Sequence, residues 1–194
     1  MLLNQALKPL TCKEAITRWE KEKGEVASEA TVIEMQFQWP PIEKMDGALS
    51  TLVNCEKLSL SSNIIDKIAG IAGMRNLKIL SLGRNNIKTL SGIETVAETL
   101  EELWISYNGI DKLKVMTAMK NLKVFYIANN NIREWAEVNR LQDCPNLRDL
   151  VLFGNPVMDT QADAETWRNQ VQNRLKQVSK IDGVPIVRVE DFEG

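Results

Sequence analysis

Histidine is absent from this chain of 194 residues. Histidine is the usual general base near neutral pH and a common metal ligand, so its absence excludes histidine-based catalytic triads and imidazole metal sites. Cysteine is scarce, and its three residues, Cys12, Cys55 and Cys144, form no CxxC pair. A disulfide network and a zinc site are therefore not expected. The pattern favours reduced thiols in an intracellular compartment.

Long apolar runs and a strong net charge are also missing. No stretch approaches the ~20 apolar residues of a membrane span, and the first residues lack the apolar core of a signal peptide. The net charge is only −2, which gives no electrostatic case for nucleic acid or an anionic membrane as a partner. No phosphate-binding loop, EF-hand or aspartate cluster is present. We therefore expect a protein that is not an enzyme and has no cofactor and no metal.

A repeat dominates what is present. The template L-x-L-x-x-N-x-I-x-x-L fits LSLSSNIIDKI (58–68), LSLGRNNIKTL (80–90), LWISYNGIDKL (103–113), FYIANNNIREW (125–135) and LVLFGNPV (150–157). A degraded copy, MQFQWPPIEKM (35–45), precedes them with Pro40 at the asparagine position. Self-similarity at this period is typical of a leucine-rich-repeat solenoid. The repeated asparagines are Asn63, Asn85, Asn108, Asn130 and Asn155.

Each template position has a physical interpretation. The first two apolar residues lie two apart, so both face the core side of a strand. The asparagine follows the strand, where its amide can bond the backbone of adjacent turns and form a structural ladder. About ten residues remain for the return, so we expect short helical or 3₁₀ segments there, for example in 70–74 and 92–100. The prediction is an α/β solenoid with a parallel β-sheet on one face and short helices on the other.

The two exposed ends of a solenoid need caps. Thr11 and Glu14 have the spacing of a capping box, and Trp19 is expected to pack on the first repeat. We predict one domain over 1–194, monomeric by itself. It comprises an N-terminal helical cap (1–30), six repeats of which the first is degenerate (32–158), a C-terminal helical cap (159–187) and an acidic tail (188–194).

The remaining strand positions point away from the core and line the open, concave sheet. There the first repeats are polar, with Glu34, Gln36 and Gln38 assigned to the first, whereas later repeats bring large apolar side chains onto strands about 4.8 Å apart. A patch of this kind is rarely left uncovered, and Trp and Tyr often dominate interface energies. Scattered surface apolars, or a covering loop, are the alternative. The predicted partner-binding residues are Trp104, Tyr126, Phe153, Val124, Val151, Glu102, Tyr107, Arg84, Ser81 and Asp149.

A second candidate surface is basic. Four cations lie in the C-terminal cap: Arg168, Arg174, Lys176 and Lys180. They could contact an acidic surface such as that of tubulin, and the alternative is an ordinary solvated helix face.

Specific stretches carry a family resemblance. In chain order these stretches are PPIEKMDGALSTL, LSLGRNNIKTL…VAETLEELWISYNGI, LFGNP and KIDGVPI. Through them the chain resembles the leucine-rich-repeat light chains of axonemal outer-arm dynein over about residues 12–186. The resemblance implies a non-catalytic light chain that binds a dynein heavy chain near the microtubule-binding stalk tip and regulates motility in the axoneme of cilia and flagella. It places the heavy-chain surface at Trp104, Tyr126 and Phe153. The alternative is a general intracellular adaptor of the phosphatase-regulatory or spliceosomal type.

Overall fold

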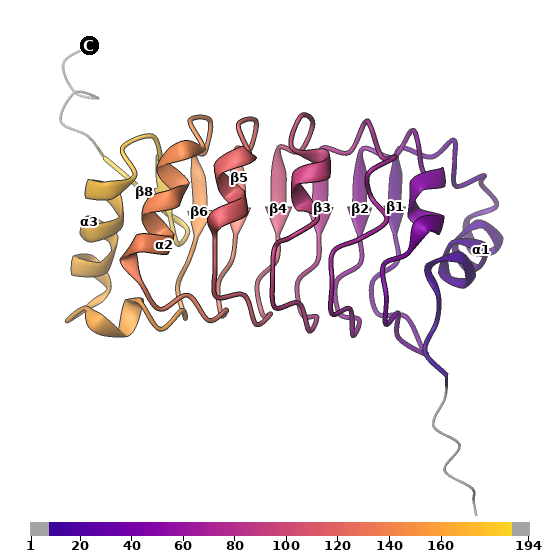
Figure 1. Cartoon of the computed structure of the whole chain (residues 1–194), viewed down its shortest axis with the longest axis horizontal. Coiled ribbons are helices and arrows are strands. Elements are labelled where there is room, and N and C mark those ends of the chain that lie inside the picture. Colours follow the sequence, from indigo (N-terminus) through magenta and orange to yellow (C-terminus); the bar gives the residue numbers. More distant parts are fainter. Residues whose placement is uncertain (1–7, 188–194) are drawn as a thin grey trace, which may run out of the picture.

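The computed structural model describes residues 8–187 and forms one sheet of eight strands in sequential order. β1 to β7 are parallel, and β8 pairs antiparallel with β7. Figure 1 shows the strands in a row along the long axis, with the return segments opposite them. This arrangement confirms the predicted leucine-rich-repeat solenoid. The strands are β1 (Val32–Glu34), β2 (Lys57–Ser59), β3 (Ile79–Ser81), β4 (Glu102–Trp104), β5 (Val124–Tyr126), β6 (Asp149–Val151), β7 (Lys180–Ile181) and β8 (Val184–Pro185).

Helices cap both ends and fill the returns. Figure 1 shows α1 (Cys12–Lys23) at one end of the row and α3 (Ala164–Arg174) at the other. The stretch 70–74 forms turns instead of the expected helical segment. The other helical segments of residues 8–187 are short: η1 (Gly47–Thr51), η2 (Ile93–Val96), η3 (Lys114–Ala118), α2 (Trp135–Asn139), η4 (Arg140–Asp143) and η5 (Met158–Thr160).

The core is built from single rows of apolar side chains. The central residue of each strand from β1 to β6, and the second residue of β7, is buried and pairs in register with its neighbours, so one side chain per turn stacks along the solenoid. Cys55 is buried in another row, before the strands begin, and burial raises the pKa of its thiol to about 11. The stacked strand residues are Ile33, Leu58, Leu80, Leu103, Phe125, Leu150 and Ile181.

The repeated asparagines form a continuous ladder where the strands end. The Asn85 amide donates to the carbonyls of Leu60 and Leu82, both at 3.0 Å, and its oxygen accepts from the N–H of Ile65 at 3.0 Å. The bonds to Leu60 and Ile65 join this turn to the previous one, and the bond to Leu82 closes the turn itself, so the buried amide and the backbone groups satisfy one another. The same bonds recur at Asn63, Asn108, Asn130 and Asn155.

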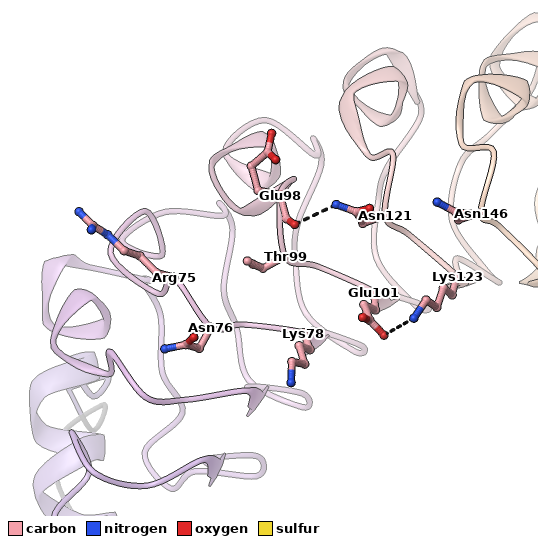
Figure 2. A pocket seen from close by; sticks show the side chains of 9 residues that line it. All are labelled: Arg75, Asn76, Lys78, Glu98, Thr99, Glu101, Asn121, Lys123 and Asn146. Carbon is pink, nitrogen blue, oxygen red and sulfur yellow. Dashed lines mark hydrogen bonds and ion pairs between the residues drawn. The ribbon is translucent and has the colours of Figure 1, made fainter.

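A second ladder runs along the opposite edge, where the strands begin. Asn54, Asn76, Asn121 and Asn146 each donate to a backbone carbonyl of the previous turn at 2.8–3.0 Å. Thr99 stands at the equivalent position of the intervening turn, and its shorter side chain reaches only the Val96 carbonyl of its own turn, at 3.5 Å. Figure 2 shows this edge, with the bond from Asn121 to the Glu98 carbonyl.

The first repeat corrects one prediction. Ile33, rather than Met35, pairs with Leu58, so Val32, Glu34 and Gln36 take the outward positions assigned to Glu34, Gln36 and Gln38. A slip of two residues keeps the same side chains facing the core, so alternating hydrophobicity alone could not reveal it. Two extra residues are accommodated in the loop before Ile42, which still donates to Asn63 as the ladder requires.

The caps hold the ends of the sheet through specific bonds. Thr11 and Glu14 form a capping box at the start of α1, and Trp19 is buried against the first repeat. At the other end the Asp182 carboxylate accepts from the N–H groups of Leu152 and Phe153 and from the indole N–H of the buried Trp167. Asp182 thereby satisfies backbone donors of the last repeat, whereas the equivalent N–H groups of earlier turns bond a carbonyl of the next strand, as Leu82 does with Trp104. The predicted tail, 188–194, lies outside the described residues.

Candidate protein-binding face

The open sheet face consists of the first and third residues of β1 to β6, which point away from the core. In β2 and β3 the third positions are Ser59 and Ser81, and both are small and nearly buried. In β4 and β5 the same positions hold Trp104 and Tyr126. One strand register therefore places a flat polar surface beside a raised aromatic surface.

The raised surface has an ordered centre. The rings of Trp104 and Tyr126 stack with centroids 5.8 Å apart and planes 18° apart. Trp104 is 36% exposed and Phe153 is 42% exposed, whereas Tyr126 is half-buried. We call this surface the aromatic patch, defined as Trp104, Tyr107, Val124, Tyr126, Val151 and Phe153.

A hollow of about 300 Å³ lies where the two surfaces meet. Its floor contains Gly83 and serines. A Cβ on Gly83 would come within 3.3 Å of the Ser106 carbonyl oxygen, so a larger residue would be crowded there. The Ser61 hydroxyl of the floor is paired with the Ser81 hydroxyl at 2.7 Å. The residues that line the hollow are Ser61, Ser62, Gly83, Arg84, Trp104, Ser106, Tyr107 and Tyr126.

The rim of the hollow carries one cation held over a ring. The Arg84 guanidinium lies 4.2 Å from the centroid of the Tyr107 ring. Both residues have left-handed backbones, with φ of 55° and 59°, which mark the tight turn after each strand. The rim therefore combines an apolar ring with a positive charge, which suits a partner segment with an apolar and an acidic side chain.

Polar contacts hold the patch from its far side. The Tyr126 hydroxyl donates to Oδ2 of Asp149 at 3.0 Å, and Lys180 donates to the same oxygen at 2.9 Å. Burial raises the pKa of Tyr126, and its bond to Asp149 raises it further. The bond to Asp149 likewise raises the pKa of Lys180. The tyrosine is thus a neutral donor, and the lysine is a cation held against the sheet.

The structure separates the predicted site residues into several groups. Trp104, Tyr107 and Phe153 are exposed, whereas Val124, Val151 and Glu102 are half-buried on the same face. Ser81 contributes to the floor of the face, and Asp149 supports Tyr126.

The four basic residues have different surroundings. The Arg174 guanidinium lies 4.1 Å from the Trp135 ring centroid and donates to the Gln170 carbonyl, and Lys180 is paired with Asp149. Arg168 is half-buried and Lys176 is exposed. A contact with tubulin through these residues stays a prediction.

The sequence reasoning missed two exposed aromatics. Phe37 and Trp39 are 76% and 75% exposed and lie in the loop of the first repeat. Their signal was present in MQFQWPP, because in the observed register Phe37 takes the position of Ser62 and Arg84, in the turn after the buried strand residues. It was obscured because this copy was aligned two residues out of register in the strand.

A second hollow, of about 420 Å³, lies on the edge where β3 to β5 begin (Figure 2). Its charges are largely paired, since Lys123 bonds Glu101 at 2.7 Å and Lys78 bonds Glu56 at 2.8 Å. No aromatic side chain lines it. In residues 8–187 no cluster of acidic or thiol side chains could hold a metal ion, and no helix is long and apolar enough to cross a membrane.

The repeated parallel strands and the asparagine ladder define the class of protein. This is a leucine-rich-repeat protein with an open sheet face. Residues 53–95 match the family described as Leucine Rich repeats (2 copies). The fold is similar to a chain in the crystal structure of the Drosophila melanogaster SNF/U2A' complex, with a TM-score of 0.63, 19% identity and coverage of 77% of this chain and 88% of that one. At this identity the likeness shows the fold alone.

Full-length relatives are more specific. The chain is 57% identical over 184 residues to dynein axonemal light chain 1 of Danio rerio, covering 95% of this chain and 96% of the relative. It is 57% identical over 187 residues to the protein of the same name from Xenopus laevis, covering 96% and 97%. The chain belongs to the dynein axonemal light chain 1 family, which confirms the resemblance drawn from its sequence.

Proposed function

We propose that this chain is a non-catalytic light chain of axonemal dynein that docks its open sheet face on an outer-arm heavy chain near the microtubule-binding stalk tip. The names of its relatives support a dynein light chain in the axoneme of cilia or flagella. The stacked pair of Trp104 and Tyr126 beside the hollow is the observation that supports the docking surface. Through this contact the chain regulates motility, and by itself it is a monomer.

The shape of the face indicates how a heavy chain is held. An apolar side chain of the partner enters the hollow and contacts the Trp104 ring, and the aromatic patch covers the residues around it. Arg84 and Glu102 lie at its border, so they select orientation by charge. Most of the binding energy is expected from the aromatic side chains, because buried Trp and Tyr are the usual hot spots.

A binding titration tests this function. Purified chain is titrated with the stalk-tip domain of an outer-arm heavy chain, using the wild type, Trp104→Ala and Trp39→Ala. Trp39 is the matched control, because it is an exposed tryptophan outside the aromatic patch. We expect Trp104→Ala to weaken binding at least about tenfold, or about 1.4 kcal/mol, and Trp39→Ala to leave it unchanged.

Two results would overturn the proposal. Absence of wild-type binding would reject the heavy chain as the partner and favour a general adaptor. Equal binding by the wild type and Trp104→Ala would reject the open sheet face as the docking surface.

A further inference from the structure

A chain of contacts crosses the sheet from β4 to β7. Trp104 stacks on Tyr126, the Tyr126 hydroxyl donates to Asp149, and Lys180 donates to the same carboxylate oxygen. We propose that Asp149 and Lys180 are positioning residues of the binding face, which act on a partner through the orientation of Tyr126 and Trp104. This inference rests on the proposed function, since it assigns a role within the same docking surface.

The strand register explains why these side chains meet. Asp149 on β6 lies directly opposite Lys180 on β7, which the C-terminal cap adds to the sheet. Asp149 also lies opposite Val124 on β5, so Tyr126, two residues further on, reaches it diagonally. Long side chains can span such diagonal pairs across neighbouring strands.

Asp149 is held by these two donors. Its side chain is 19% exposed, and Oδ2 accepts both bonds. Oδ1 is buried and has no hydrogen-bond partner among residues 8–187. Among residues 8–187, the ion pair of Asp149 is formed with Lys180. Removal of Lys180 would leave a nearly buried carboxylate without this counter-charge, so the carboxylate would turn toward water and release the Tyr126 hydroxyl.

The consequence for binding is preorganisation. With its hydroxyl directed at Asp149, Tyr126 presents a ring and not a donor to a partner. That ring fixes the plane of Trp104, so the partner meets an indole that is already oriented. An exposed aromatic that is ordered before binding loses less conformational freedom on binding. Loss of the contacts among Tyr126, Asp149 and Lys180 should therefore weaken binding without removing any partner contact.

Four variants separate positioning from direct contact. Lys180→Met removes the charge and keeps the length of the side chain, and Lys180→Arg restores the charge. Tyr126→Phe keeps the ring and removes the hydroxyl. Lys123→Met is the matched control, because Lys123 forms a similar ion pair with Glu101, at 2.7 Å, on the edge of the solenoid.

The first measurement needs no partner. The tryptophans are labelled with 5-fluorotryptophan, and the ¹⁹F resonance of Trp104 is identified with Trp104→Phe. We expect Lys180→Met and Tyr126→Phe to shift or broaden the Trp104 resonance and to leave that of the buried Trp167 unchanged. Lys180→Arg should restore the wild-type resonance, and Lys123→Met should not alter it. An unchanged Trp104 resonance in both Lys180→Met and Tyr126→Phe would overturn the inference.

The second measurement is the stalk-tip titration with the same variants. We expect Lys180→Met and Tyr126→Phe to weaken binding roughly three- to tenfold, with recovery in Lys180→Arg. Weaker binding by Lys180→Met with an unchanged Trp104 resonance would mean that Lys180 contacts the partner directly, which overturns the inference. A shifted resonance with wild-type affinity overturns it as well. If the wild type does not bind, the docking proposal fails, and the resonance separately decides whether Lys180 and Asp149 orient Trp104.

Discussion

The two halves of the open sheet face share a backbone and differ in their side chains. From β1 to β6 the strands have three residues each and pair in continuous parallel register. Their third positions change from Ser59 and Ser81 to Trp104 and Tyr126 within one repeat. The hollow forms at this step, because the small floor of one half meets the aromatic wall of the other. The repeat thus supplies the frame, and recognition depends on residues that the repeat leaves unspecified.

The largest expected effect contrasts two neighbours on β4. Leu103→Ala should destabilise the fold by about 2–5 kcal/mol, because Leu103 is fully buried and its loss leaves a cavity. Trp104→Ala should cost only about 1 kcal/mol, the size of an aromatic pair. Urea unfolding of the two variants measures the difference. Equal losses would show that Trp104 belongs to the core.

Substitution of a ladder asparagine should lower the stability of the fold, as Leu103→Ala does, and should not weaken partner binding, as Trp104→Ala does. In Asn108→Ala the N–H of Ile87 loses its side-chain partner, and the carbonyl of Leu82 keeps only the amide of Asn85, which should cost about 2 kcal/mol. Stalk-tip affinity of the variant that remains folded should match the wild type. Stability equal to the wild type in urea unfolding would mean that water replaces the amide at no cost.

The asparagine ladder where the strands end is continuous, whereas the second ladder is interrupted at Thr99, and a substitution can complete it. Thr99→Asn should complete the second ladder by donating to the carbonyl of the previous turn, and should stabilise the fold by about 1 kcal/mol. Asn121→Thr is the reciprocal variant, and it should lose a similar amount because it breaks the bond to the Glu98 carbonyl. Thermal unfolding of both measures the pair. Opposite signs are expected, and destabilisation by both would show that this turn cannot accommodate an amide.

The smallest effect concerns the floor of the hollow. Gly83→Ala adds a methyl group 3.3 Å from the Ser106 carbonyl oxygen and narrows the space beside Trp104. Stalk-tip binding should weaken about threefold, or about 0.7 kcal/mol, while the free energy of unfolding changes by less than about 1 kcal/mol. Gly47→Ala is the control, because its Cβ would meet no atom within 4 Å. Unchanged affinity in Gly83→Ala would mean that the partner does not enter the hollow.

Periodic chemistry made much of the fold predictable. Leucines two apart, followed by an asparagine at a fixed offset, specify a strand, its buried side and the bonds at its end. The position of Trp104 followed from the same alternation, because residues adjacent to a buried leucine in a strand must face outward. Family membership added the partner class, which no residue of the open face could name by itself.

Three features of the structure were not predicted from the sequence, each for an identifiable reason. The first strand was misplaced because a two-residue slip preserves the buried side. The second ladder was missed because Asn54, Asn76, Asn121 and Asn146 fall outside the repeat template, and Thr99 interrupts their period. Lys180 was assigned to a basic helix face, whereas β7 brings it to an aspartate 31 positions earlier in the chain.

The sequence by itself determined the solenoid, its core rows, its asparagine ladder and the side of the sheet on which the aromatics lie. These depend on local spacing, which repeats with every turn and needs no knowledge of distant contacts. Only the tertiary structure decided how the aromatics are held and where the hollow forms. Those features arise between turns, where the register of one strand against the next brings together side chains such as Tyr126, Asp149 and Lys180 that no local pattern connects.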